Sequence, residues 1–217
     1  QVFILFLLTF LSYFTHAQQT GSFNTNIQFQ GNQRELSFHV PSSYDSTKDY
    51  RLIVGLHGLG DNSSNFRNAL INNLGWNQHF SNTIIACPDG GDDRNSDFYT
   101  PDGDQQVIQR TIDYAANNYS IDTSRIILEG FSLGGMSALN YGLDHPDKFK
   151  GLLLNTPAIQ GILIAKNDSV FNYQNAAEIP IYITNGSQDV TYVNIVDTLH
   201  QQLVTHDGIV RKNTVQG

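Results

Sequence analysis

Ser132 stands within a glycine pattern that is typical of a nucleophile on a sharp turn. Residues 130–135 read GFSLGG, which matches G-x-S-x-G with one further glycine. Residues 125–129 before it are short, apolar and β-branched in character, and residues 136–143 after it keep an apolar face at helical spacing. The pattern therefore predicts a strand-to-helix elbow that lifts the serine hydroxyl out of a sheet. A serine in a flexible glycine loop is the alternative interpretation.

A serine at such an elbow becomes a nucleophile only with a base, an orienting carboxylate and donors for the oxyanion. We expect the N–H of Leu133, the residue after the serine, to be one oxyanion donor. The second is expected at the N–H of Leu59, because Gly58 and Gly60 on either side let that backbone approach a substrate closely. His57, at the end of the preceding strand, is expected to shape this loop rather than to act as the base.

The loop LHGLGD and the serine pattern together resemble those of the α/β-hydrolase esterases. The closest resemblance is to the carboxylesterase/phospholipase group and to secreted esterases of the polyhydroxybutyrate-depolymerase and feruloyl-esterase type. Residues 120–125 (SIDTSR) and 144–149 (DHPDKF) also resemble the latter type, and the similarity runs from about Arg51 to the end. The resemblance implies an α/β-hydrolase fold, a catalytic triad in the order serine, acid, histidine, and no metal or organic cofactor.

Asp189 is the expected triad acid, because it comes directly after the predicted strand 179–184, where the resemblance places that residue. A turn or helix-capping aspartate is the alternative. Only His200 and His206 follow it, and both belong to the next predicted helix. Enzymes of this type carry the base in a loop after one further strand. We therefore expect the catalytic histidine beyond Gly217 and outside this chain, which alone should hydrolyse esters slowly or not at all, with His206 as the fallback.

The remaining segments predict an α/β fold. Strands that alternate with helices indicate a mostly parallel sheet with helices on both faces and with the working groups at the carboxyl ends of its strands. Under the resemblance, this domain would be incomplete before the last strand, loop and helix. The expected elements are a hairpin of strands 27–29 and 36–40, further strands at 50–56, 83–86, 125–129, 151–154, 180–183 and 209–212, and helices at 66–74, 105–119, 136–143 and 193–203.

Composition limits the other possibilities. A chain of 217 residues suits one α/β domain, and a formal net charge of −8 argues against nucleic acid as a partner. Cys87 is the single cysteine, so no internal disulfide can form, and its place after an apolar strand predicts a buried structural thiol. No cluster of cysteine and histidine suggests a metal site.

The first residues differ from the rest of the chain. Residues 2–14 are almost unbroken apolar sequence, and the small-residue site that follows predicts a secretory signal peptide, 1–17, cleaved after Ala17. An uncleaved membrane anchor is the alternative. The missing initiator methionine leads us to expect an incomplete signal at its start, followed by the hydrolase domain at 18–217. This predicts a secreted or periplasmic protein without stable membrane association after cleavage.

These observations predict a secreted serine esterase that works through an acyl-enzyme at Ser132. Expected substrates are small or polysaccharide-linked carboxylic esters: acyl or feruloyl esters on polysaccharide, or short polyesters. Tyr99 and Trp76 could stack on a sugar or phenolic ring, but both are more often core aromatics, so neither is assigned to the site. The alternatives are a serine peptidase of the same fold, a non-catalytic binding module and an anchored lipid-processing enzyme. The sequence does not indicate the oligomeric state.

Overall fold

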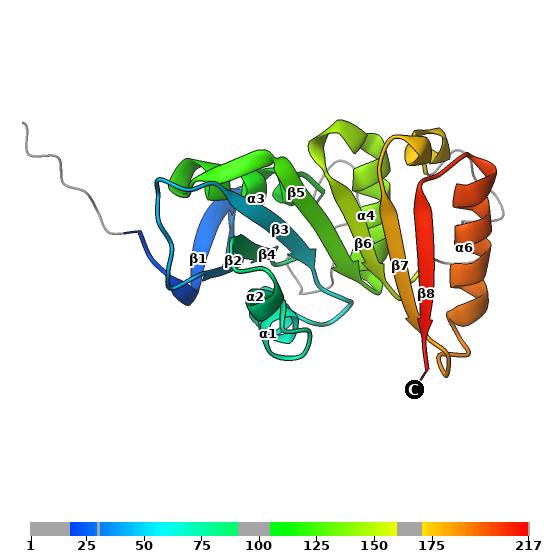
Figure 1. Cartoon of the computed structure of the whole chain (residues 1–217). Helices are drawn as coiled ribbons and strands as arrows, with labels where there is room; N and C mark the ends of the chain where they lie inside the picture. The colour runs from blue at the N-terminus through cyan, green and yellow to red at the C-terminus, as the bar shows by residue number, and fades with distance from the viewer. Residues whose placement is uncertain (1–17, 30, 91–104, 160–170, 217) are drawn as a thin grey trace, which may run out of the picture.

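The protein folds around an eight-stranded sheet in the order β1-β2-β4-β3-β5-β6-β7-β8 (Figure 1). The structure is a computed structural model that describes residues 18–29, 31–90, 105–159 and 171–216. The expected signal peptide and Tyr99 lie outside these described residues. The strands are β1 (Gly21–Phe29), β2 (Asn32–Val40), β3 (Tyr50–Leu56), β4 (Thr83–Pro88), β5 (Ile121–Phe131), β6 (Gly151–Asn155), β7 (Ile181–Gly186) and β8 (Val210–Val215).

The sheet is mostly parallel, as the alternation of strands and helices predicts. β1 and β2 form an antiparallel hairpin, and β2 pairs antiparallel with β4. Every neighbouring pair from β4 to β8 is parallel. Because the carboxyl ends of parallel strands meet at one edge, the residues that follow β3, β5, β6 and β7 are gathered there. The hairpin strands are longer than expected, and the strands of the parallel part differ from the predicted ranges mainly at their ends.

Helices cover both faces of this sheet (Figure 1). One face carries α3, α4 and α6, and on the other face α1 covers β2, β3 and β4. β3 and β4 are therefore buried on both sides and correspondingly apolar, whereas β6 and β7 are buried on alternate residues and β8 has no fully buried residue. No helix among the described residues is both long enough and apolar enough to cross a membrane. The helices are α1 (Ser63–Asn72), α2 (Trp76–His79), α3 (Gln105–Asn118), α4 (Leu133–Asp144) and α6 (Val193–Thr205), with short 3-10 turns at Pro146–Lys148 and Tyr173–Ala177.

Two helices begin earlier than their apolar patterns predict, and each does so for a local reason. α1 starts at Ser63 because the side chain of Asn62 accepts the N–H of Asn65 at 2.9 Å and caps the first turn. α4 starts at Leu133, directly after the serine, so no loop separates the end of β5 from the helix. The short helix α2 was not expected from the sequence.

The core divides into two clusters on opposite faces of the sheet. The larger one packs the strands against α3, α4 and α6. The smaller one joins Phe66 and Leu70 of α1 to β3 and β4, and it contains Cys87. The prediction of a buried thiol is confirmed, because Cys87 is fully buried, and burial raises the pKa of this thiol well above its usual value.

Candidate active site

Ser132 lies in a strained conformation between β5 and α4. Its φ of 55° and ψ of −118° fall in a region that non-glycine residues rarely adopt, and such strain is characteristic of functional turns. The backbone on both sides holds it there. The Ser132 N–H donates to the carbonyl of Asn155 at 2.9 Å, and the Ser132 carbonyl accepts the N–H of Ala158 at 2.9 Å. The residues that follow β6 are therefore bonded to both sides of the elbow.

The glycines of the pattern are needed because backbones cross here at close range. A Cβ on Gly130 would lie 2.2 Å from the carbonyl oxygen of Gly134, and a Cβ on Gly134 would lie 2.2 Å from that of Leu56. Side chains at these positions would separate the start of α4 from the end of β3. The glycines of the G-x-S-x-G pattern are therefore required for close backbone packing at the elbow. The alternative interpretation, a serine in a flexible glycine loop, does not fit this packing.

The two expected oxyanion donors lie on either side of the serine. Leu133 is the first residue of α4, where backbone N–H groups have no partner within the helix. Leu59 lies in a tight turn closed by the Asp61 N–H to the Gly58 carbonyl at 3.2 Å, and its side chain is 65% exposed. A Cβ on Gly58 would meet the Cβ of Ser132 at 3.3 Å, so this turn packs directly against the serine.

His57 is buried, with both ring nitrogens in hydrogen bonds. Its Nδ1 donates to the carbonyl of Gly58 at 2.8 Å, and its Nε2 accepts the N–H of Gly90 at 3.0 Å. This pairing assigns the proton of a neutral ring to Nδ1. The histidine ties the Gly58 turn to the segment after β4, which supports the predicted loop-shaping role and leaves no lone pair for a base.

Asp189 follows β7 at the same edge of the sheet as Ser132. Its carboxylate oxygen Oδ1 is 3.4 Å from the N–H of Tyr192, and its carbonyl accepts the N–H of Val193 at 2.9 Å. Asp189 therefore accepts hydrogen bonds at the start of α6, as the alternative interpretation of a turn or helix-capping aspartate predicts in part. Its side chain is half-buried, and its role as the triad acid stays a prediction from its place after β7.

His206 and Ser132 are not brought together. His206 ends α6 and precedes β8, whose first residue, Val210, pairs with the start of β7, whereas Ser132 follows the end of β5. The two residues therefore lie at opposite edges of the sheet, as the course of α6 in Figure 1 shows. The His206 ring stacks on Tyr173 and its Nδ1 bonds the Gln202 carbonyl at 2.9 Å. Within the described residues the Ser132 hydroxyl hydrogen-bonds no histidine.

Glu129 is a buried carboxyl beside the elbow that the sequence analysis did not single out. Its Oε1 accepts the side-chain N–H of Asn155 at 2.6 Å, and the Oδ1 of that asparagine accepts the hydroxyl of Thr184. Burial raises the pKa of Glu129 to about 8, although the bond from Asn155 acts in the opposite direction. The sequence does contain a signal for this residue: Glu129 is a charged residue in an otherwise apolar predicted strand, three positions before Ser132.

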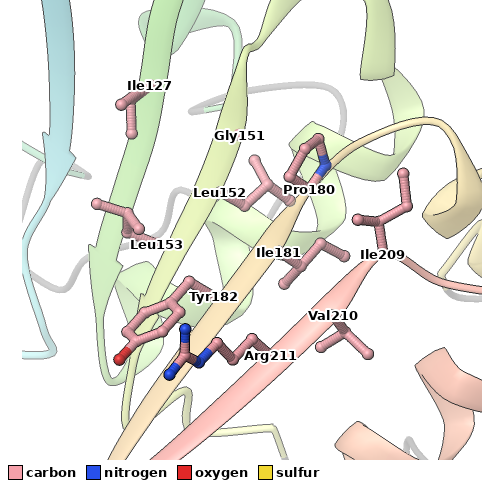
Figure 2. A pocket seen from close by; sticks show the side chains of 10 residues that line it. All are labelled: Ile127, Gly151, Leu152, Leu153, Pro180, Ile181, Tyr182, Ile209, Val210 and Arg211. Atoms are coloured by element: carbon pink, nitrogen blue, oxygen red, sulfur yellow. The ribbon is translucent and has the colours of Figure 1, made fainter.

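Two cavities differ in their relation to the serine. One, of about 420 Å³, lies between α1 and the ends of β5 to β7 and is lined by Phe131, the neighbour of Ser132. The other, of about 300 Å³, is an apolar hollow at the starts of β6, β7 and β8, on which Tyr182 and Arg211 lie side by side (Figure 2). This second cavity is remote from the elbow, because the β5 residue that lines it is Ile127, five positions before Ser132. We therefore do not include the second cavity in the site. No group of three or more metal-ligating side chains occurs among the described residues.

The family follows from comparison with known proteins. The model of a family described as "Putative esterase" matches residues 28–212. The chain belongs to this esterase family. Among curated relatives, a bifunctional acetylxylan esterase/xylanase of Neocallimastix patriciarum is 29% identical over 49% of this chain and 15% of its own length. "Probable feruloyl esterase C" of Aspergillus terreus is 28% identical over 56% of this chain and 45% of its own. The chain thus matches less than half the length of these relatives.

Solved structures of esterases share the fold. A ferulic acid esterase superposes with a TM-score of 0.72 at 16% identity, covering 93% of this chain and 92% of that one. A ferulic acid esterase from Anaeromyces mucronatus, in complex with ferulic acid, gives 0.68 at 19% identity over 90% and 83%. S-formylglutathione hydrolase from Staphylococcus aureus gives 0.72 at 17% identity over 91% of both. The predicted α/β-hydrolase fold and the resemblance to its esterases are confirmed.

Proposed function

We propose that this member of the esterase family hydrolyses carboxylic esters through an acyl-enzyme on Ser132. The observation that carries the proposal is the strained serine between the start of α4 and the Gly58 turn. In this geometry a hydroxyl can reach a carbonyl carbon while backbone N–H groups face the oxygen. The N–H groups of Leu133 and Leu59 would bind the oxyanion of the tetrahedral intermediate, whose stabilisation is commonly the largest contribution to such catalysis.

The proton transfers require a base, and we assign Asp189 as the carboxylate that orients it. The base itself would be a histidine carried by a segment that continues from β8 beyond residue 217. β8 ends at Val215, which pairs with the last residue of β7, so a segment leaving it starts at the edge where Ser132 and Asp189 lie. The histidine would take the serine proton, give it to the leaving alcohol, and then activate water to release the acid.

Acyl or feruloyl esters linked to polysaccharide are the proposed substrates, by analogy with the feruloyl and acetylxylan esterases among its relatives. Secretion after cleavage at Ala17 is part of the same proposal, because polysaccharide esters are extracellular substrates. The chemistry at Ser132 uses side chains and backbone groups of the chain alone, and no cofactor is included.

Labelling with a fluorophosphonate tests the nucleophile. The full-length protein should form a covalent adduct on Ser132 and release 4-nitrophenol from 4-nitrophenyl acetate. Ser132→Ala should lose both, whereas Ser124→Ala, at an exposed serine on β5, the strand that precedes Ser132, should retain both. An adduct that persists in Ser132→Ala would overturn the assignment.

A separate comparison tests the base. His206→Ala in the full-length protein should leave ester hydrolysis unchanged, because His206 lies at the far edge of the sheet. Replacement of the catalytic histidine beyond residue 217 should lower kcat by several orders of magnitude, as loss of a triad base does. Loss of hydrolysis in His206→Ala would contradict this placement.

A further inference from the structure

Three non-glycine residues among those that the structure describes have a positive φ, which is sterically unfavourable for residues with a side chain. They are Ser132 at 55°, Thr156 at 41° and Asp207 at 56°. Asp207 directly follows the end of α6, where the short polar side chain of an aspartate tolerates this conformation. Thr156 is β-branched, and a positive φ is a genuine outlier for such a residue. The strain at Thr156 therefore needs an explanation in its surroundings.

The side chain of Thr156 does not compensate for the strain. Within the described part of the chain its hydroxyl makes no hydrogen bond, whereas its backbone N–H donates to the carbonyl of Thr184 on β7 at 2.7 Å. The next residue is Pro157, and a following proline restricts the backbone of Thr156 further. The backbone around Thr156, and not its side chain, therefore holds it in this conformation.

The residues on either side of Thr156 bond the two ends of Ser132. The Ser132 N–H donates to the carbonyl of Asn155 at 2.9 Å, and the Ala158 N–H donates to the carbonyl of Ser132 at 2.9 Å. The first bond continues the parallel pairing of β5 with β6, but an extended chain would carry residue 158 roughly 10 Å beyond residue 155. Both bonds reach one serine only because the chain turns sharply at Thr156 and Pro157. We call residues 155–158 the 155–158 turn.

The 155–158 turn also packs against the start of α4. A Cβ added to Gly135 would lie 3.1 Å from the Cα of Pro157 and 3.2 Å from its Cβ, so the turn and the helix are in close contact. From the helix side, the Met136 N–H donates to the carbonyl of Ser132 at 3.1 Å. The peptide groups on both sides of the Ser132 Cα are thus held. Relaxation of Ser132 to a negative φ would have to break these bonds or move the turn.

We propose that the 155–158 turn positions the nucleophile, and that the strained backbone of Thr156 keeps Ser132 in its own strained conformation. The Ser132 hydroxyl is thereby held against the Gly58 turn, which carries the expected oxyanion donor Leu59. Thr156 is a positioning residue and touches no reacting atom. The catalytic consequence rests on the proposed function, whereas the coupling between the two strained residues does not depend on any reaction.

Thr156→Gly in the full-length protein tests the catalytic consequence. Glycine adopts a φ of 41° without strain, so the turn is no longer forced, and the variant should be at least as stable toward urea as the unchanged protein. The maximal rate of fluorophosphonate labelling should nevertheless fall about tenfold, because a displacement of about 1 Å at a reacting group can cost about 100-fold in rate. The half-saturating concentration of the reagent should not change, since Thr156 does not contact it.

Two further variants separate the explanations. Thr156→Val keeps the β-branched shape and lacks only the hydroxyl, so it should be labelled as fast as the unchanged protein. Asp207→Gly removes the positive φ of a non-glycine residue at the far edge of the sheet, and it should also leave labelling unchanged. Slow labelling of folded Thr156→Val would show that the hydroxyl acts, which would overturn the proposal. Unchanged labelling of Thr156→Gly, or a lower stability of this variant, would overturn it as well.

A double-mutant comparison of stabilities gives a second readout that needs no reaction. Ser132→Gly and Ser132→Ala are made in the otherwise unchanged protein and again in Thr156→Gly, and the urea midpoints are compared. If Thr156 imposes the strain on Ser132, the advantage of glycine over alanine at residue 132 should shrink in Thr156→Gly. An equal advantage in both backgrounds would mean that the two residues are not coupled. Failure of the esterase itself would show as a missing Ser132 adduct in the unchanged protein, and this comparison would still decide the coupling.

Discussion

Asn155 is bonded to Ser132 by its backbone and to Glu129 by its side chain. The Asn155 carbonyl accepts the Ser132 N–H at 2.9 Å, and its side-chain amide donates to the Glu129 carboxyl at 2.6 Å. The end of β6 therefore connects the strained elbow to the buried carboxyl of the adjoining cavity. A substitution at Glu129 can therefore shift the backbone of Ser132 through Asn155, in addition to changing the lining of the cavity.

Ser132→Gly should be more stable than Ser132→Ala, although both lose the hydroxyl and hence the fluorophosphonate adduct. Glycine adopts a φ of 55° without steric cost, whereas alanine keeps the strain of the serine. Relief of such strain is worth about 1 kcal/mol or more in the free energy of unfolding, partly offset by the greater entropy of unfolded glycine. Urea unfolding of the two variants measures the difference. Equal stabilities, or a less stable Ser132→Gly, would mean that the strain at Ser132 does not exceed the entropic cost of glycine.

Gly130→Ala should destabilise the fold severely. The new Cβ would lie 2.2 Å from the carbonyl oxygen of Gly134, and because that atom belongs to the backbone, α4 would have to move. We expect a loss of more than about 2 kcal/mol in the free energy of unfolding.

Gly186→Ala is the matched control for this substitution, at the end of another strand of the same sheet. An added Cβ there would have no heavy atom within 4 Å, so the change should stay within about 1 kcal/mol. Chemical denaturation of both variants gives the comparison, and similar losses in the two would show that steric crowding at the elbow is not the cause.

The stability of the protein should fall between pH 4.5 and pH 8 because of Glu129. Burial raises the pKa of this carboxyl from 4.5 to about 8, so in that interval the folded state holds a proton that the unfolded state has released. The free energy of unfolding then decreases as pH rises, and the contribution of Glu129 is complete below the unfolded pKa and lost above the folded one.

Glu129→Gln should remove this dependence, so its stability relative to the unchanged protein should increase from pH 5 to pH 8. The increase is a few kcal/mol at most, since one pKa unit corresponds to roughly 1.4 kcal/mol. Denaturant titrations at the two pH values measure it. A constant difference between the two proteins would show that Glu129 titrates normally.

Cys87 should report unfolding. It is the single cysteine of the chain, it is fully buried, and burial raises the pKa of its thiol well above the usual value. A disulfide reagent such as DTNB should not react measurably with the native protein at pH 8, because thiolate is both scarce and inaccessible. One equivalent should react in concentrated urea. Rapid reaction in native buffer would place the thiol at the surface and would contradict the packing of α1 against β4.

The sequence alone determined the elements that local patterns specify. Apolar β-branched runs predicted the parallel strands, and the glycines around Ser132 predicted an elbow because only glycine permits such close backbone contact. The family follows from the same residues. Helix starts at Ser63 and Leu133 were less predictable, since a capping side chain and a direct strand-to-helix junction set them.

The tertiary structure decided which of the candidate residues meet. Sequence order offered His206 as a fallback base, but the direction of α6 relative to β8 places it at the opposite edge from Ser132. The burial of Glu129 likewise depends on what α1, β6 and β7 bring to its side of the sheet. Whether a carboxyl is solvated or enclosed is a property of those distant segments, and this is why a sequence pattern could locate the serine but not the chemistry of the cavity beside it.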